Sequence, residues 1–272
     1  MFNHLFSDLR LYRYLVSMQI RAQLQYKLNV LLDIATFFGV TALEFIALLL
    51  FFVPFPTLLG WRIGEVALLT AIMSISFGIA EMAGAGIDNF PTTIRRGEFD
   101  RVMLRPAGTF MQVIGSDFRL RRCGRLAQGT IAFFIALRLL PGLHWTVDKL
   151  LILPIGILSG SVIFIAILLL GATICFWSVE TDEITNVLTY GAREMLSYPL
   201  TIYHQALQRF FLFIVPVAFG SYVPACYILG RPLPFGLPAA IAFAAPLVAL
   251  LFALVAAWIW RFGVHHYQST GS

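Results

Sequence analysis

Long stretches of apolar residues are the feature that most constrains the fold of this chain. The clearest stretch runs from Leu237 to Trp260 and contains no charged residue. A helix needs about 20 mostly apolar residues to cross a hydrocarbon core of about 30 Å, and a helix satisfies its own backbone hydrogen bonds within lipid. The stretch therefore predicts a membrane-spanning helix.

The composition agrees with a membrane environment. Hydrophobic residues make up 59% of the 272 residues and charged residues only 12%, whereas ordinary globular proteins carry about 25% charged residues. Too few polar side chains remain to cover a compact particle of this size in water. The same numbers argue against a disordered chain, a fibrous protein, a disulfide-stapled secreted domain and a soluble nucleic-acid-binding protein.

Apolar windows bounded by charge predict an all-α polytopic membrane protein with six transmembrane helices, forming one transmembrane domain over residues 1–272. Five windows are clear, at 28–53, 63–87, 123–140, 150–178 and 237–260. The remaining span lies within 179–234, where two interpretations stay open. Apolarity alone favours 207–229, although two prolines there disfavour a straight helix. The segment before it carries Arg193 and Glu194, which are costly to bury.

The positions of Lys and Arg predict the orientation of the chain. Basic residues gather in the first 27 residues, in the loop 88–122 and at the end of the last span. The positive-inside rule places such segments in the cytoplasm, so we expect both termini and this loop to be cytoplasmic. The formal net charge of +5 is then a matter of topology. No nucleic-acid partner is expected, since no binding module is recognisable.

Residues 1–27 have the pattern of an interfacial helix. At helical spacing, Arg10, Arg13, Ser17 and Arg21 share one face, and apolar side chains gather on the opposite face. A basic amphipathic helix that leads directly into a span is typical of one that lies in the headgroup plane. A helix packed on another subunit is the alternative.

Polar stripes within two spans are candidates for a substrate pathway. Asp33 and Glu44 are three helical turns apart on one face of the first span. In the second span, Ser74 and Glu81 belong to a polar stripe that begins at Thr70. Ionisable groups inside spans are functional candidates by default, although such stripes also serve as hydrogen-bonded glue between helices. Both interpretations stay open.

No pattern in the chain indicates catalysis or metal binding. The histidines are scattered without an HExxH or GxSxG motif, and the three cysteines have no CxxC spacing. A phosphate-binding GxxxxGK[ST] loop is absent as well. We therefore expect no catalytic residue, no metal site and no cofactor in this chain.

The loop over 88–122 is longer than a connection between two helices requires. Pro91 and the threonines after it favour a short helix from about Thr93 to Met103, with apolar residues among charged ones. A helix joined to two spans could transmit force to them. The alternative is that the arginines of the loop only enforce topology and contact anionic lipid.

The same loop carries a family resemblance. Its segment Ile94-Arg95-Arg96-Gly97-Glu98-Phe99-Asp100, followed by Leu104-Arg105-Pro106, resembles the coupling helix of type 2 permeases of ATP-binding-cassette (ABC) transporters. The segments Tyr198-Pro199-Leu200, Ile214-Val215-Pro216 and Val223-Pro224-Ala225 resemble the region of that family between the fifth span and the short external helices before the sixth.

The resemblance implies a permease driven by two separate ATPase subunits, with ATP and Mg on those partners, and a second permease that is identical or homologous. It implies a fifth span at 183–200, external or re-entrant helices at 201–236, and a location in the bacterial inner membrane among its lipids. The candidates for coupling to the ATPase are Arg95, Arg96, Glu98, Phe99, Asp100, Arg101 and Arg105. The candidates for the pathway are Asp33, Glu44, Ser74, Glu81, Arg193 and Glu194.

The resemblance implies an exporter, and the sparse charge of the pathway favours a lipid, a glycolipid or a hydrophobic small molecule as the substance that it moves. A polytopic membrane enzyme, or a membrane scaffold without an ATPase partner, is the alternative.

Overall fold

The computed structural model describes residues 2–178 and 185–267, and nearly all the regular structure in them is helical. In chain order the elements are α1 (Phe2–Leu24), α2 (Lys27–Phe51), β1 (Thr57–Leu58), β2 (Trp61–Arg62), α3 (Ile63–Ala83), α4 (Ala85–Asp88), α5 (Phe90–Arg95), α6 (Phe99–Met103), α7 (Thr109–Ile114), η1 (Leu120–Arg122), α8 (Cys123–Leu139), α9 (Val147–Ile174), η2 (Val187–Gly191), α11 (Ala192–Leu196), η3 (Leu200–Ile202), α12 (Gln205–Arg209), η4 (Phe210–Ile214), η5 (Val217–Gly220), α13 (Tyr222–Leu229), η6 (Pro234–Gly236), η7 (Ala239–Ala244) and α14 (Ala245–His266). The predicted helical membrane architecture is confirmed in outline.

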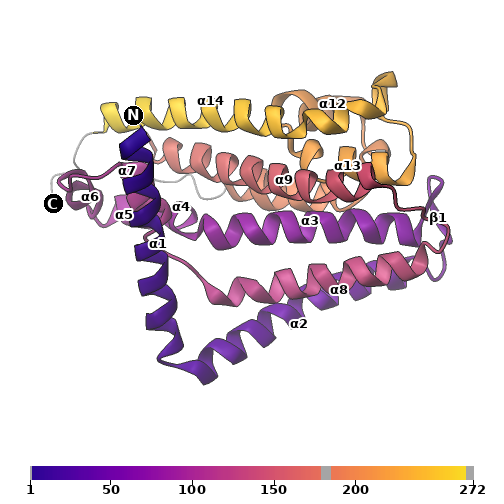
Figure 1. Cartoon of the computed structure of the whole chain (residues 1–272), viewed down its shortest axis with the longest axis horizontal. Coiled ribbons are helices and arrows are strands. Elements are labelled where there is room, and N and C mark those ends of the chain that lie inside the picture. The colour runs from indigo at the N-terminus through magenta and orange to yellow at the C-terminus, as the bar shows by residue number, and fades with distance from the viewer. Residues whose placement is uncertain (1, 179–184, 268–272) are drawn as a thin grey trace.

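Four helical segments in the described part are long and apolar enough to cross a membrane. They are α2, α3, α9 and the continuous segment Ala239–His266 that ends in α14. α8 runs beside α3 (Figure 1) but has only 17 residues, at the short end of what a bilayer requires. These four segments match four of the six predicted spans, and the count of six stays a prediction.

α3 is the central helix of the bundle. It packs against α8, α9 and α2, and most of its side chains are buried on every side. A helix that is apolar all round is stable only in such a position. By contrast, α2 and α14 keep large apolar side chains exposed, including Leu43 and Leu254. An apolar outer surface of this kind is suited to lipid.

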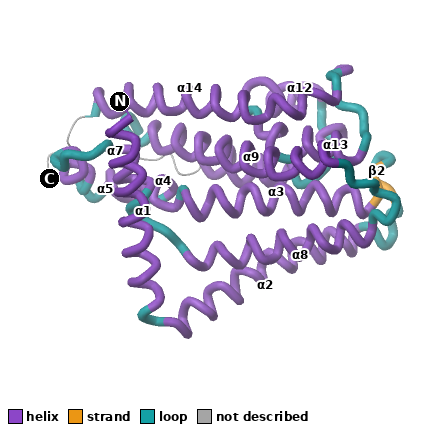
Figure 2. Tube along the Cα trace, viewed as in Figure 1, coloured by secondary structure: helices purple, strands orange, loops and turns teal. Residues whose placement is uncertain are grey.

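The two ends of the bundle differ. At one end, which we call the hairpin end, β1 pairs antiparallel with β2 through a turn at Leu59 and Gly60, both of which have positive φ angles. Paired positive φ angles match the twist of a two-residue hairpin. At the opposite end, which we call the loop end, α5, α6 and α7 gather (Figure 1), and Figure 2 shows α5 and α7 there with the loops that join the short helices.

α1 crosses the loop end at a steep angle to α3 and α14 (Figure 1). It is fastened to the loop by side-chain hydrogen bonds. Gln19 Nε2 donates to the Ser116 carbonyl at 2.8 Å, and the Leu120 amide donates to Gln23 Oε1 at 3.0 Å. The basic residues Arg10, Arg13 and Arg21 remain exposed. This is the orientation that an interfacial helix requires.

Residues 205–229, which we call the re-entrant hairpin, enter the bundle and turn back. α12 and α13 both lie toward the hairpin end (Figure 1), and Tyr227 Oη donates to Asp148 Oδ2 at 2.7 Å, at the start of α9. The segment between them reaches the middle of α3, where Ser76 Oγ donates to the Gly220 carbonyl at 3.4 Å.

The interpretation of 207–229 as one straight span is therefore wrong. The segment is broken into short helices around Pro216, because proline lacks the amide hydrogen that a continuous helix needs. Within the alternative fifth span, the described residues from Thr185 to Leu196 are helical. Residues 183 and 184 lie outside the described part.

Two glycines allow the tip of the re-entrant hairpin to reach α9. A Cβ atom added to Gly160 of α9 would lie 2.8 Å from the Gly220 Cα, and one added to Gly220 would meet the Gly160 backbone. Small residues at such crossings let two backbones approach closely within membranes. Any side chain at either position would separate the hairpin from α9.

We predict that Gly160→Val lowers the free energy of unfolding by about 2 kcal/mol, because overpacking forces the backbone apart. Thermal unfolding of the detergent-purified chain measures this loss. Gly39→Ala is the control, since a Cβ atom there meets nothing within 4 Å. Equal stability of the two variants would contradict the close contact.

Candidate functional site: buried charges, a central cavity and an exposed loop surface

A cluster of buried charges joins α3 to the start of α8. Arg122 forms an ion pair with Glu81 Oε1, and Arg125 Nε lies 3.0 Å from Glu81 Oε2. Tyr190 Oη donates to Glu81 Oε1 at 3.2 Å, and Arg122 Nη2 lies 3.8 Å from Asp88 Oδ2. We call Glu81, Arg122, Arg125 and Tyr190 the ion cluster.

The local sequence explains how both arginines reach Glu81. Arg122 and Arg125 are three residues apart, so they project from one face of the helical turn that begins α8. Their guanidinium carbons also lie 5.2 Å from the centre of the Phe37 ring. A cation above an aromatic face is stabilised by the ring quadrupole, so the Phe37 ring stabilises the guanidinium groups of both arginines.

A second buried arginine group lies nearer the hairpin end. Arg193 of α11 binds Glu44 of α2 and also the neighbouring Glu194. The Phe77 ring lies between the two groups, with its centre 5.9 Å from the guanidinium carbon of Arg193 and 5.3 Å from that of Arg125. The two groups therefore share one aromatic surface of α3.

A small polar cavity, which we call the central cavity, opens beside Arg193. It measures 30 Å³ and its lining comes from α2, α3, α8 and the segment around α11. Thr70 Oγ1 donates to the carbonyls of Val66 and Ser197, at 3.0 and 2.9 Å. The lining residues are Thr41, Glu44, Phe45, Leu48, Thr70, Ser74, Gln128, Arg193, Glu194, Ser197 and Tyr198.

The structure brings most of the predicted pathway residues together. Glu44, Ser74, Arg193 and Glu194 all line the central cavity. Glu81 lies deeper, in the ion cluster. Asp33 does not join them, because it is exposed on the outer surface of α2 and is not part of the cavity lining.

The residues of the polar stripe on α3 differ in their surroundings. Thr70 and Glu81 bind groups on other segments, as helix-connecting residues do, whereas Ser74 faces the cavity.

Sequence reasoning missed the polar partners that α8 supplies. The positive-inside rule treats Arg122 and Arg125 as basic residues of the cytoplasmic side, and Gln128 is not among the predicted site residues. The usable signal was their spacing, since positions 122, 125 and 128 recur every three residues on one helical face. An isolated carboxylate at Glu81 also required a cation from another segment.

The predicted loop contacts are mostly exposed. Arg95, Arg96, Glu98, Arg101 and Arg105 are at the surface, and Asp100 is half-buried. Three of these residues line a groove of 220 Å³ between the short loop helices. Its lining is Thr93, Glu98, Arg101, Val102, Arg105, Gln112, Val113 and Ser116. Leu104, beside this groove, is 86% exposed.

Phe99 does not belong to that surface. Its side chain is fully buried among aromatic rings from three other segments, so it is not accessible to a partner, and a coupling role for Phe99 stays a prediction that would act through packing. The ring centroids of Phe99 lie 5.2 Å from Phe90, 5.5 Å from Phe176 and 5.0 Å from Tyr267. We call Phe90, Phe99, Phe176, Trp260 and Tyr267 the aromatic cluster.

Asp100 contributes to the same attachment. Burial, together with a hydrogen bond to Asp100, raises the pKa of Tyr267 above its ordinary value. Aromatic pairs at these separations each stabilise by about 1 kcal/mol beyond their buried area. The loop is therefore packed firmly on the ends of α9 and α14.

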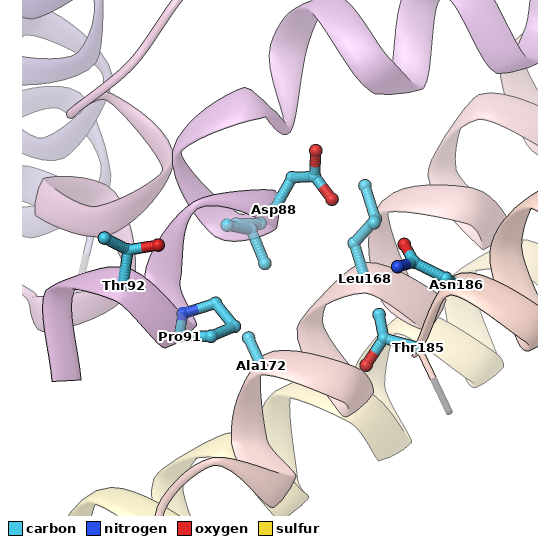
Figure 3. Close-up of a pocket in the computed structure, with 8 residues that line it drawn as sticks. Asp88, Pro91, Thr92, Leu168, Ala172, Thr185 and Asn186 are labelled. Atoms are coloured by element: carbon cyan, nitrogen blue, oxygen red, sulfur yellow. The ribbon is translucent and has the colours of Figure 1, made fainter. Parts of the chain in front are cut away.

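A further cavity of 170 Å³ lies between the loop and α9. Figure 3 shows Asp88, Pro91 and Thr92 on the loop side of this cavity, with Leu168 and Asn186 opposite. Burial raises the pKa of Asp88 above its ordinary value, and the Arg122 guanidinium only partly offsets this.

We predict that Glu81→Gln lowers the free energy of unfolding by about 3 kcal/mol, because it leaves two buried arginines without their shared carboxylate. Glu98→Gln, at the exposed loop surface, provides the matched control. Thermal unfolding in detergent distinguishes them. A Glu81→Gln variant as stable as Glu98→Gln would show that the ion cluster does not hold α3 and α8 together.

Comparison with known proteins identifies the family. No curated protein and no solved structure matches the chain. A family model described as ABC-2 family transporter protein matches residues 38–271, which include the bundle, the loop and the re-entrant hairpin. Because this match covers most of the chain, the protein belongs to the ABC-2 transporter family, as the resemblance of its loop and external segments predicted.

Proposed function

We propose that this chain is the permease subunit of an ATP-driven exporter. Membership of the ABC-2 family makes it a membrane-embedded transporter component. In our proposal, two separate ATPase subunits hold ATP and Mg and dock on residues 88–122. The permease moves a lipid, a glycolipid or a hydrophobic small molecule, and it works in the bacterial inner membrane with both termini cytoplasmic.

The observation that carries this proposal is the exposed charged surface of the loop. Glu98, Arg101 and Arg105 border a groove on the outside of the loop end, and Leu104 stands exposed beside it. An apolar residue surrounded by charged ones is suited to docking, since the apolar contact contributes affinity and the charges contribute specificity. A loop that served only to set topology would need no shaped groove.

Force applied to this surface has a direct route into the spans. α6 is anchored through Phe99 to the ends of α9 and α14, and the loop ends at Arg122, which is paired with Glu81 of α3. Tightly packed elements move as units because protein interiors deform little. Closure of the ATPases would then displace α3, α9 and α14 together.

A six-span topology fits this arrangement. α8 and the helical segment that includes α11 would provide the third and fifth crossings, which places the loop end in the cytoplasm and the re-entrant hairpin in the outer leaflet. The clustering of exposed arginines at the loop end agrees with the positive-inside rule.

A second permease subunit would complete the pathway. The side chains of Glu44 and Glu194 remain 44% and 57% exposed although each is bound to Arg193. Half-exposed carboxylates are costly against hydrocarbon, so this face of α2 and α11 requires a polar lumen or another subunit. We place the pathway there, between two permeases that are identical or homologous.

We predict that the double variant Arg101→Glu and Arg105→Glu weakens ATPase docking about tenfold or more, because charge reversal opposes a complementary surface. Co-purification of the ATPase subunits and substrate-stimulated ATP hydrolysis in nanodiscs measure the effect. Glu98→Ala should weaken docking less, since it removes a charge without reversing it.

Arg138→Glu is the control for charge alone, since this residue is exposed near the hairpin end of α8. It should leave docking and ATP turnover unchanged. Full docking and full ATP turnover in the double variant would refute the assignment of the loop as the ATPase surface.

A further inference from the structure

The central cavity offers mainly hydrogen-bond acceptors. Thr41 donates its hydroxyl hydrogen to the Phe37 carbonyl one turn earlier at 3.0 Å, and the single hydroxyl hydrogen of Thr70 is taken up by the carbonyls of Val66 and Ser197, at 3.0 and 2.9 Å. Their oxygens then keep only lone pairs toward the cavity. Glu44 and Glu194 add carboxylate oxygens, while the terminal nitrogens of Arg193 are directed to those two carboxylates. The donors that remain include the Arg193 Nε, which has no hydrogen-bond partner among the described residues, the Ser74 hydroxyl and the Gln128 amide nitrogen.

The net charge of the lining also favours a cationic ligand that donates hydrogen bonds. Two carboxylates share a single guanidinium within the cavity, so the lining carries one excess negative charge when all three groups are ionised. A phosphate or carboxylate ligand would meet repulsion from both glutamates. A cation would balance the excess charge in a region where charge is poorly screened.

Two buried polar side chains face this cavity without a partner. Ser74 is 2% exposed and Gln128 is 4% exposed, and both line the cavity. Neither side chain makes a hydrogen bond within residues 2–178 and 185–267. Buried polar groups are normally hydrogen-bonded, because leaving them unpaired is costly. Their polar atoms are accessible from the cavity, where a ligand group can bond to the Ser74 and Gln128 oxygens.

We propose that the central cavity binds the primary ammonium group of an amphiphile. An ammonium group carries one positive charge and three N–H donors, and it has no acceptor, which matches an acceptor-rich lining with excess negative charge. The 30 Å³ volume suits one compact polar group of about the size of a water molecule.

The surroundings of the cavity fit the apolar part of such a ligand. Phe45, Leu48 and Tyr198 also line it, and α2, which supplies part of the lining, carries exposed apolar side chains such as Leu43 and Leu50. A single alkyl chain can therefore extend from the cavity into lipid. This inference rests on the proposed transport function in one respect, namely that the bound amphiphile is the transported substrate.

The test is equilibrium binding to the full-length chain in phosphatidylcholine nanodiscs, measured by calorimetry with three probes. Dodecylamine has both the positive charge and the N–H donors. Dodecyltrimethylammonium has the charge alone, and dodecanol has neither the charge nor the N–H donors. We expect dodecylamine to bind at least tenfold more tightly than either of the others. The proposal would be overturned if either dodecyltrimethylammonium or dodecanol bound as tightly as dodecylamine.

Variants locate the binding site. Glu194→Gln removes the excess charge but leaves Arg193 paired with Glu44, and Gln128→Leu removes an unpartnered amide without touching an ion pair. Each should weaken dodecylamine binding about tenfold, while Asp33→Asn on the exposed surface of α2 should leave it unchanged. Undiminished binding in both cavity variants, with folding verified by thermal unfolding, would also overturn the proposal.

The outcome separates this inference from the proposed function, because no ATPase subunit is present in the binding experiment. Selective dodecylamine binding by a chain that assembles with no ATPase would refute the transport function and leave the ammonium site intact. ATP-coupled export by a chain that binds the three probes equally would refute the ammonium site and leave the transport function intact.

Discussion

Pairing of charges within an apolar bundle is the constraint on which the arrangement of this protein depends. A charge without a partner in such a medium costs several kcal/mol, so Arg122, Arg125 and Arg193 each require a carboxylate from another part of the chain. Glu81 meets the first two arginines and Glu44 meets the third. These pairs tie α8 to α3 and α11 to α2, and thereby fix the helices that surround the central cavity.

The loop end shows how the remainder of the bundle is organised around α3. The aromatic cluster binds α6 to α9 and α14, while α1 is hydrogen-bonded to the chain after α7. The loop is thus a packed part of the fold with one charged outer surface. The same segment combines a rigid inner attachment with an accessible outer face, which is the combination that a force-transmitting element needs.

Local patterns predict the parts of this structure that depend on local physics. Apolar windows bounded by charge indicated α2, α3, α9 and α14, because the length and hydrophobicity of a span are properties of consecutive residues. The candidates Glu44, Ser74, Arg193 and Glu194 were each found as isolated polar residues in apolar surroundings. Their meeting in one cavity depends on the packing of α11 against its neighbours, which no single window encodes.

Other features were predicted incompletely for reasons that can be named. Arg122 and Arg125 resembled surface charges because the positive-inside rule counts arginines without regard to their partners. Phe99 stands among charged residues in sequence, yet it is buried because distant rings of α9 and α14 cover it. The re-entrant hairpin is apolar enough to resemble a span, and only its prolines and its contact with Gly160 reveal that it turns back.

The re-entrant hairpin also constrains the order in which the protein assembles. A segment that enters and leaves the membrane on one side exposes unpaired backbone groups unless other helices already surround it. Its tip rests on Gly160 and its lining comes from α3 and α9, which precede it in the chain. In the topology that we propose, the hairpin would therefore dock only after α3 and α9 have been inserted and paired.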